Sequence, residues 1–393
     1  MKNLWNTKKA STCKNDLDLR VYTSNLLGKS DELVLHGGGN TSVKSLVDGE
    51  KILFVKGSGW DLVSIKSEGF SPVRLDTLLK MAKLSTLSDS DMVKEQRIAM
   101  IDKYAPSPSV EAILHALIPY KFVDHTHADA IVSISNSENG IRDIKKVFPN
   151  FLIVDYVMPG FLLAQKIYEQ CLDVDWDSLD GIILHNHGIF TFDNSAKDSY
   201  EKMIDAVTQA EVFLEQNAKL QIAHSFEPSE CDIQKIVKTI SSAKGYDVSI
   251  NINQTPLANY YASQDNLKEF ASRGVLTPEH IIRTKRVPLV MEDTNLEEGI
   301  SNYMKEYEEY FKKYAQDEEM LNSAPNYMVI KNLAVISFGK TAEEASIVND
   351  IVEHTMRAVL RADKLGGYKS ISLKDSFEME YWELEQIKLR KQG

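Results

Sequence analysis

The chain has 393 residues and a formal net charge of −12 at pH 7, from 45 Lys and Arg against 57 Asp and Glu. Hydrophobic residues make up 43% and charged residues 26%, which is a globular balance and excludes a wholly disordered chain. The length predicts more than one domain, and the acidic charge argues against a nucleic acid as the main partner.

The sequence also argues against a membrane protein or a secreted one. No apolar stretch approaches the ~18 residues that a membrane span needs. Residues 1–15 are polar and lack the apolar segment of a secretory signal. The three cysteines are odd in number and unpatterned, which fits a reducing compartment. We therefore expect a cytoplasmic protein that binds neither membrane nor nucleic acid.

In chain order, the first half predicts alternating strands and helices. Two strands are expected to run into glycine-rich loops, at residues 33–36 before Gly37-Gly38-Gly39 and at 51–55 before Lys56-Gly57-Ser58-Gly59. The further expected elements are an amphipathic helix over 76–100, a helix over 110–117 capped by Ser109, a strand and its exit over 121–135, a strand over 151–157, a strand pair over 181–192 that turns at Asn186-His187-Gly188, and a helix over 195–220 with Ser195 and Asp198 as a capping box.

One segment in the second half of the sequence is weakly similar to a segment in the first half. Residues 328–339 line up with 183–193 when Phe338 is set on Phe192, and each copy leads into a capping-box helix. On that register Leu333 replaces His187. The second half is thus either a degenerate copy that lost its chemistry or an unrelated strand-helix unit. The expected domains are 1–225, 226–375 and a charged helical tail over 376–393.

The strongest candidate site is the pair His125 and His127. Residues two apart on a strand project from the same face, so both imidazoles can reach one metal. His187, in its tight turn, is the best third candidate, and three nitrogen ligands leave an open position for water or substrate, as in catalytic zinc sites. From spacing alone, an exposed strand pair is the commoner outcome.

Several polar residues near these histidines in the sequence have two possible roles. Glu111 is either a carboxylate that favours a helix N-terminus or a general acid/base beside a metal. His185 is either a fourth ligand of the metal, or a residue that packs in the interior or hydrogen-bonds to a ligand. Asp124 and Asp129 are either carboxylate partners of a metal or solvated acids. His115 is expected to be packed or hydrogen-bonded.

The glycine-rich loops predict a phosphate site. Glycine lets backbone amides approach an anion closely, while neighbouring Asn, Thr and Ser add donors and Lys56 adds charge. A third, serine-rich helix start lies at residues 107–109. No P-loop and no dinucleotide-binding fingerprint occurs.

Taken in order, the segments GGGNTS, KGSG, PSVE, HTH, DYVMPG and NHG resemble the class II aldolase/adducin family. Its metal-dependent members include fuculose- and rhamnulose-1-phosphate aldolases and ribulose-5-phosphate epimerase. The resemblance covers roughly residues 17–220. Longer matches at SNLLGKS, LTPEHIIRTKRVP and MEYWELEQIKL resemble the aldolase half of bifunctional rhamnulose-1-phosphate aldolase/alcohol dehydrogenases. No dehydrogenase activity is expected, because the chain lacks a nucleotide-binding fingerprint.

The resemblance implies a three-layer α/β/α fold with a mixed, largely antiparallel central sheet, assembled as a homo-oligomer, with a tetramer favoured. It implies His125, His127 and His187 as ligands of Zn²⁺ or another divalent metal, and Glu111 and Tyr156 as catalytic residues. The residues implied in binding the substrate phosphate are Gly39, Asn40, Ser42, Lys56, Ser58, Gly59 and Ser109.

The activity implied is a zinc-dependent aldolase that cleaves a ketose-1-phosphate, such as rhamnulose- or fuculose-1-phosphate, to dihydroxyacetone phosphate and lactaldehyde. The metal would stabilise the enediolate charge, Glu111 would move the proton at its carbon, and Tyr156 would protonate the departing aldehyde from a neighbouring subunit. Two alternatives remain: a sugar-phosphate epimerase or dehydratase on the same metal site, and a non-catalytic adducin-like binding module.

Overall fold

The computed structural model describes residues 1–222, 232–292, 295–384 and 386. Its contacts divide the chain into a first unit, Met1–Ser135 with Gly140–Leu214, and a second unit, Asn136–Asn139 with Glu215–Gly393. The predicted boundary at 225/226 and the end of the predicted tail, from residue 387, lie outside the described residues. Each unit is described by itself.

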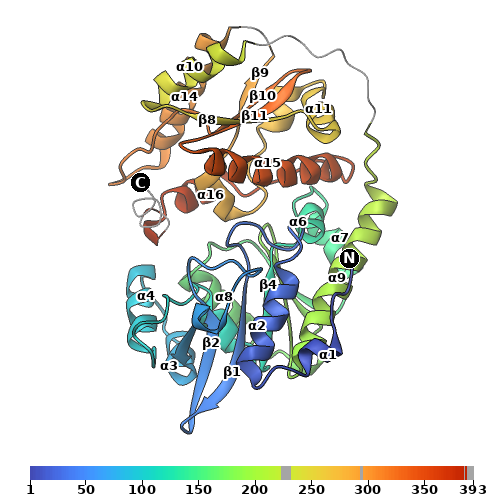
Figure 1. Ribbon diagram of the computed structural model, residues 1–393, viewed down its shortest axis with the longest axis vertical. Coiled ribbons are helices and arrows are strands. Elements are labelled where there is room, and N and C mark those ends of the chain that lie inside the picture. The colour runs from blue at the N-terminus through green and yellow to red at the C-terminus, as the bar shows by residue number, and fades with distance from the viewer. Residues whose placement is uncertain (223–231, 293–294, 385, 387–393) are drawn as a thin grey trace. The chain divides into compact units, whose positions relative to one another are not determined.

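The first unit is built on a seven-stranded sheet in the order β3-β2-β1-β4-β7-β6-β5, of which Figure 1 labels β1, β2 and β4. Neighbouring strands are antiparallel except for β5 and β6, which are parallel, so the predicted mixed and largely antiparallel sheet is confirmed. The strands are β1 Asn40–Val47, β2 Glu50–Lys56, β3 Phe70–Arg74, β4 Phe122–Thr126, β5 Phe151–Val154, β6 Gly181–Leu184 and β7 Gly188–Asp193.

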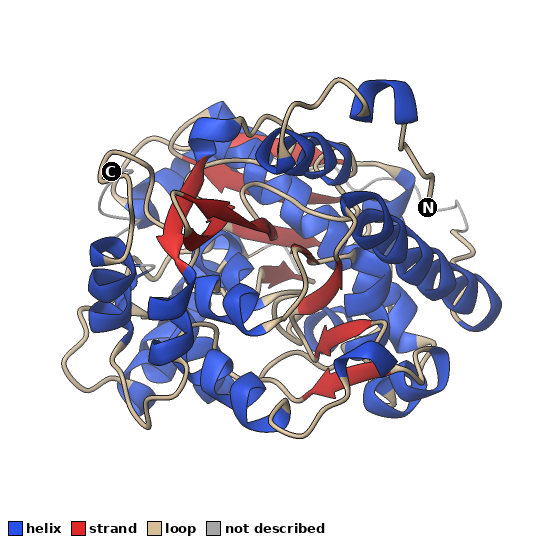
Figure 2. Ribbon diagram, turned by 90° about the horizontal axis from the view of Figure 1, so that it is seen from below, coloured by secondary structure: helices blue, strands red, loops and turns tan. Residues whose placement is uncertain are grey.

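Helices cover both faces of this sheet, which gives three layers (Figure 2). Successive residues of a strand face opposite sides, so in β4 Phe122 packs with α2 and α9 while Val123 packs with α5 and α8. The helices of the unit are α1 Thr7–Ala10, α2 Asp16–Leu27, η1 Ser67–Gly69, α3 Leu75–Met81, α4 Asp89–Ile98, α5 Ala112–Leu117, α6 Asp129–Ser135, α7 Gly140–Val147, α8 Phe161–Gln170, η2 Trp176–Ser178 and α9 Ala196–Asn217.

Three local predictions are wrong. The strand expected at 33–36 is a turn, because His36, Gly37 and Gly39 have positive φ angles of 40°, 84° and 62°, and the strand begins only afterwards, at Asn40. The helix expected over 76–100 is divided into α3 and α4, the second capped by its own serine. The helix expected from residue 110 begins at 112, with Glu111 at its N-cap.

The second unit has a four-stranded sheet in the order β8-β11-β10-β9. Helices α10 and α14 pack on one face, and α11 and α15 lie against β8 and β11. Its elements are α10 Ile233–Lys244, β8 Ser249–Asn253, α11 Pro256–Ala262, α12 Leu267–Ala271, η3 Pro278–His280, α13 Ile281–Thr284, β9 Leu289–Met291, α14 Leu296–Tyr314, β10 Tyr327–Ile330, β11 Ala334–Gly339, α15 Ala342–Asp363 and α16 Leu373–Glu380.

The two segments that are similar in sequence have the same order of secondary-structure elements in the two units. In each unit a 4-residue strand, a 6-residue strand and a 22-residue helix follow one another: β6, β7 and α9, then β10, β11 and α15. Both hairpin turns contain an asparagine in the left-handed conformation, Asn186 at φ 57° and Asn332 at φ 56°. The order β4-β7-β6-β5 in the first sheet corresponds to β8-β11-β10-β9 in the second.

The second set of elements does not retain the histidines. Leu333 follows Asn332 in the second turn, as His187 follows Asn186 in the first. Ile252 pairs with Ile336 of β11, whereas His125 pairs with Phe190 at the matching position of β7. The second unit therefore keeps the topology and lacks histidine at these two matching positions.

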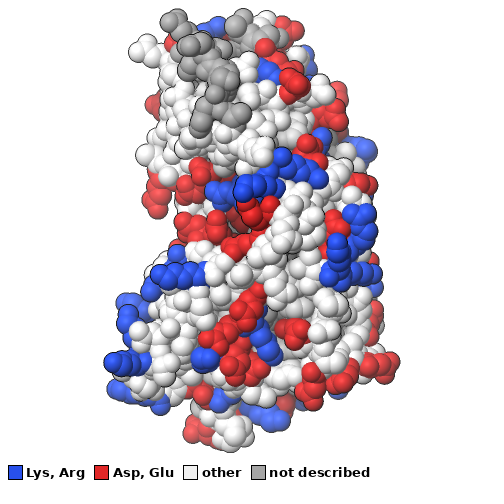
Figure 3. Space-filling model, turned by 90° about the vertical axis from the view of Figure 1, so that its right-hand side faces the viewer, with Lys and Arg blue, Asp and Glu red and all other residues white. Residues whose placement is uncertain are grey.

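The surface carries both signs of charge. On the face shown in Figure 3, acidic and basic side chains lie in small groups among neutral ones. Within the part of the chain that the structure describes, no helix combines the length and apolarity required to cross a membrane.

A buried ion pair holds β4 to the helices on one side of the sheet. Arg20 of α2 donates to Asp124 of β4, and both side chains are fully buried. The guanidinium also donates to the carbonyl of Val123 at 3.3 Å, and the hydroxyl of Ser199 on α9 donates to the other carboxylate oxygen of Asp124. One charged pair thus ties together the two helices and the central strand.

This arrangement predicts a large stability loss when the pair is broken. Arg20→Met should lower the free energy of unfolding by about 3–5 kcal/mol, because it leaves the Asp124 carboxylate buried without its cation. The matched control is Asp16→Asn, which removes the exposed pair with Lys121 and should cost about 1 kcal/mol or less. Urea unfolding measures both, and equal losses would contradict the role assigned to Arg20.

Candidate metal centre

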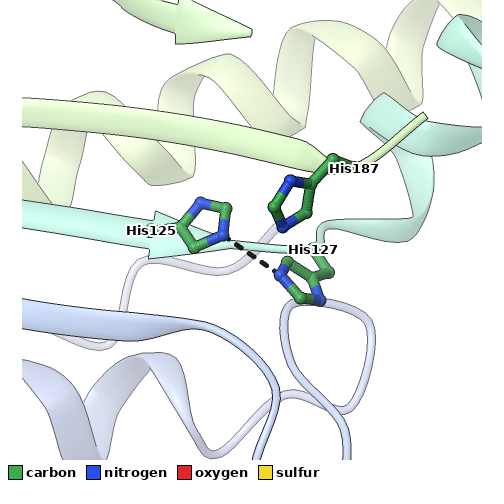
Figure 4. Close-up of side chains that lie close together, drawn as sticks. All are labelled: His125, His127 and His187. Atoms are coloured by element: carbon green, nitrogen blue, oxygen red, sulfur yellow. Dashed lines mark hydrogen bonds between the residues drawn. The ribbon is translucent and has the colours of Figure 1, made fainter. Parts of the chain in front are cut away.

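The structure brings together the three histidines predicted from sequence. His125 lies in β4, His127 directly after it, and His187 in the turn between β6 and β7 (Figure 4). One ligand nitrogen from each ring lies within 4.8 Å of the others, which makes this a group that could hold a metal ion. The Nε2 atoms of His125 and His127 are 3.1 Å apart.

Strand pairing and one glycine create this convergence. β4 runs antiparallel to β7, with Thr126 opposite Ile189, so the β6–β7 turn lies beside the end of β4. A Cβ at Gly188 would lie 2.4 Å from the carbonyl oxygen of Thr126. Only glycine therefore allows the turn that carries His187 to approach β4 this closely.

The ring of His125 is held in one orientation and tautomer. Its Nδ1 lies 3.1 Å from the carbonyl oxygen of Ile189, and a carbonyl can only accept, so Nδ1 carries the proton. The Nε2 lone pair is then left facing the other two histidines. The ring also stacks on Phe190 with centroids 4.0 Å apart. A hydrogen bond to the second ring nitrogen and a packed neighbour are the usual means of orienting a histidine that binds a metal.

Glu111 faces the same point. Its Oε2 lies 3.5 Å from Nε2 of His125, and its Oε1 lies 3.6 Å from Nε2 of His187. The carboxylate is only 6% exposed, and its Oε1 is buried without a hydrogen-bond partner among the described residues. Neutral imidazole lone pairs and a carboxylate repel one another at this distance unless a cation or a proton lies between them. The donor set thus fits a divalent cation.

A buried hydrogen-bond network orients Glu111. The side-chain amide of Asn40 donates to Oε2 of Glu111 at 2.6 Å, and its carbonyl oxygen accepts from Nε2 of His115. The Nδ1 of His115 in turn lies 2.8 Å from the hydroxyl of Ser42. Burial lowers the pKa of His115 well below its usual value, and the nearby charges of other basic residues lower it further, so the ring is neutral. The sequence expectation of a hydrogen-bonded His115 is confirmed.

A lysine that sequence reasoning missed anchors the helix that carries Glu111. The ammonium of Lys44 donates to three carbonyl oxygens at the end of α5, those of His115, Ile118 and Tyr120, at 2.8, 2.7 and 2.7 Å. A cation at a helix C-terminus satisfies carbonyls that have no partner within the helix. Burial lowers the pKa of Lys44 to about 7.

The predicted phosphate loops are tied to one another. Lys56 donates from Nζ to the carbonyl of Gly37 at 2.8 Å, and its own carbonyl accepts from the backbone of Ser109 at 3.0 Å. The backbone of Ser58 donates to Ser107 at 2.8 Å. The two glycine-rich loops and the start of α5 therefore form one connected surface beside the histidines.

Individual loop residues have different surroundings. Gly39 has φ 62°, and a Cβ there would lie 2.7 Å from the carbonyl of His125. Ser58 and Gly59 are exposed, Gly59 with φ 85°. Asn40 and Ser42 are buried, and their side chains take part in the network around Glu111 and His115.

The other candidate residues lie elsewhere. Asp124 projects from the face of β4 opposite to His125 and pairs with Arg20, so it is a structural acid and no ligand in this arrangement. Tyr156 is half-buried and follows β5, the edge strand three places from β4 in the sheet. At ~4.8 Å per strand, that edge is about 14 Å from β4.

Two family descriptions match the chain. The Class II Aldolase and Adducin N-terminal domain matches residues 20–214, and the second domain of class II aldolases matches residues 229–389. The N-terminal class II aldolase domain of a conserved protein from Thermoplasma acidophilum is 41% identical over 55% of this chain and 99% of that one, with a TM-score of 0.50.

Two further similar proteins match different shares of this chain. The uncharacterized oxidoreductase YuxG of Bacillus subtilis (strain 168) is 29% identical over 424 residues, which include 99% of this chain and 60% of the relative. The chain thus spans 60% of the length of this curated relative. The L-fuculose-1-phosphate aldolase of Thermus thermophilus is 14% identical over 50% of this chain and 95% of that one, with a TM-score of 0.34.

The buried His115 predicts a pH dependence of stability. In the unfolded chain this ring titrates near 6.5, whereas burial keeps it neutral in the folded protein. Below pH 6.5 the unfolded state binds a proton that the folded state does not, so acidification destabilises the fold by up to about 1.4 kcal/mol per pH unit. His115→Gln should lose less stability than the wild type between about pH 7 and about pH 5.5. Urea unfolding in the presence of a chelator measures this, and identical pH profiles would contradict it.

Proposed function

From the premise that this chain belongs to the class II aldolase and adducin family, we propose that it is a zinc-dependent aldolase. Its proposed substrate is a ketose-1-phosphate, such as rhamnulose- or fuculose-1-phosphate, cleaved to dihydroxyacetone phosphate and lactaldehyde. The observation that carries the proposal is the buried carboxylate of Glu111, 3.5 and 3.6 Å from two of three converging imidazoles. An acid in that position can move a proton at a carbon atom held beside a cation.

The proposed ligands of the zinc are His125, His127 and His187. Zn²⁺ prefers nitrogen ligands of this kind, and three of them leave a position open for substrate. A cation bound there supplies Lewis acidity at the carbonyl oxygen on which charge develops as the carbon–carbon bond breaks. Three neutral ligands leave its double charge undiminished, which favours a substrate carrying oxygen donors.

The geometry favours one oxygen of Glu111 as the proton carrier. Oε2 already accepts from Asn40, whereas Oε1 has no hydrogen-bond partner among the described residues. Oε1 is therefore the atom that delivers a proton to the substrate carbon after cleavage and removes it in the condensation direction. Asn40, with His115 behind it, acts as a positioning residue because it fixes the plane of the carboxylate.

The phosphate is proposed to bind in the connected glycine- and serine-rich loops. Backbone amides near Gly39, Ser58, Gly59 and Ser109 are the anchoring groups, and Lys56 contributes positive charge to the same surface. Binding energy gained at the phosphate then positions the reacting carbons several bonds away.

Tyr156 is proposed to protonate the departing aldehyde from a neighbouring copy of the chain. Tyr156 follows the edge strand β5, which is three strands from His125 and pairs directly with the strand β6 that leads into the His187 turn, so its assignment to a neighbouring copy rests on the family resemblance. The proposal therefore includes a homo-oligomer, with a tetramer favoured, that works on a small sugar phosphate in the cytoplasm.

An epimerase or dehydratase acting on a sugar phosphate is the second candidate, because the same cation and acid serve those reactions. A non-catalytic binding module is disfavoured, since such a protein has no need of a buried acid facing three histidines. A screen of ketose-1-phosphates with added zinc separates the three. Release of dihydroxyacetone phosphate supports the aldolase, a changed sugar without cleavage supports the alternative enzymes, and no turnover of any substrate supports the module.

Glu111→Gln tests the assigned acid. The variant should fold and retain zinc, because the three imidazoles are unchanged, while kcat falls about 10²–10⁴-fold. The matched control is Glu95→Gln, an exposed acid on α4, which should leave turnover unchanged. Zinc content by elemental analysis and initial rates with the best substrate of the screen measure both. A Glu111→Gln enzyme of wild-type activity would refute the role.

A further inference from the structure

The second unit contains a cavity of about 330 Å³ beside α14. All of its lining residues belong to that unit. One wall is a stripe of tyrosines spaced three or four residues apart, which places them on one face of the helix: Tyr303, Tyr307, Tyr310 and Tyr314. The lining also includes Arg286 and Val287, from the segment before β9, and Leu373, at the start of α16.

Arg286 lines this cavity without a directly bonded acid among the described residues. Its guanidinium makes no hydrogen bond or ion pair with the described residues, and its Nε is buried. Arginine remains charged in proteins, and a buried charge is costly unless it is paired. Burial accordingly lowers the pKa of Arg286. An anion entering the cavity would relieve this cost.

The buried acid that acts on Arg286 electrostatically is already engaged. Glu380 is 1% exposed, and its Oε1 accepts from the hydroxyl of Tyr307 at 2.8 Å and lies 3.9 Å from Nζ of Lys285. The same ammonium lies 3.6 Å from the centroid of the Tyr307 ring. These contacts pair Glu380 with Lys285 and fix the ring of Tyr307, while Glu380 acts on Arg286 only through its electrostatic field, without a hydrogen bond or ion pair between the two side chains.

The remaining lining indicates the body of the ligand. The hydroxyl of Tyr303 donates to the carbonyl of Val287 at 3.0 Å, which fixes a second ring of the wall. Tyrosine offers a flat apolar face and a polar edge, which suits a molecule with C–H faces and hydroxyl groups. The exposed Lys313 adds a positive charge to the lining. The exposed Glu306 and Glu309 add carboxylate oxygens, of which Oε1 of Glu306 accepts from Lys268 at 3.2 Å.

We propose that this cavity binds a small polyhydroxylated organic anion, with its phosphate or carboxylate group on Arg286 and its body against the tyrosine stripe. The guanidinium fork matches the oxygens of either head group in a bidentate manner. The residues that form this site are distinct from the histidines and the acid of the metal centre, and the proposal does not depend on the aldolase reaction.

The experiment uses the full chain with His125→Ala and His127→Ala, treated with chelator, so that no metal holds the ligand, and any binding that both Arg286 variants retain is assigned to the phosphate loops of the first unit. Titration calorimetry with glucose 6-phosphate, glucuronate and neutral glucose compares a phosphate, a carboxylate and an uncharged body. At least one anion should bind about tenfold or more tightly than glucose, and Arg286→Met should weaken that binding about tenfold or more. Binding by the first anion assigns a phosphate head group, and binding by the second a carboxylate.

Three further variants keep the test decisive. Arg286→Lys retains the charge without the fork and should also weaken binding, which covers the case in which Arg286→Met fails to fold. Lys313→Met should weaken binding, whereas Lys305→Met, an exposed lysine of α14 outside the cavity lining, should not. The proposal is overturned if neither anion binds, or if binding is the same in both Arg286 variants as in the parent.

Discussion

The metal centre depends on the antiparallel pairing of β4 with β7. That register sets His125 opposite Phe190 and brings the turn carrying His187 beside the end of β4. A slip of one residue would turn His125 and His127 to the opposite face, where Asp124 pairs with Arg20. The buried ion pair therefore also fixes the register of β4, because a slip of one residue would move the Asp124 carboxylate to the face away from Arg20.

The sequence predicted the local parts of this site well and the long-range parts poorly. Two histidines at a spacing of two, and a histidine in an Asn-His-Gly turn, have a local signature. Lys44 and its three carbonyl partners do not, because those partners are 71 to 76 residues away in the chain. Arg20 and Asp124 are separated by 104 residues, so only the folded chain reveals that they meet.

The errors have physical causes as well. Residues 33–35 are apolar and include the buried Leu33 and Val34, so they have the pattern of a strand, although His36 and the glycines after it impose a turn. The tyrosines of α14 have the helical spacing of an ordinary core-facing stripe, so the sequence does not mark them as the wall of a cavity. Neither the unpaired state of Arg286 nor the cavity beside it has a signal in the sequence.

Comparison of the two sheets separates fold from chemistry. The strand order and the lengths of the matched elements are shared, yet Ile252 and Leu333 occupy the positions of His125 and His187. The topology thus does not require histidine at these two positions, and the histidines of the first unit are an addition to it. The second unit instead surrounds Arg286 with tyrosines, on a helix that packs against its own sheet.

The most direct test of the central claim is a diffraction measurement at the zinc absorption edge on crystals of the zinc-loaded protein. The account predicts a single strong anomalous peak within about 2.0–2.1 Å of a nitrogen from each of His125, His127 and His187, with Glu111 alongside. A peak at another site, or three histidines with no metal between them in zinc-saturated crystals, would contradict it.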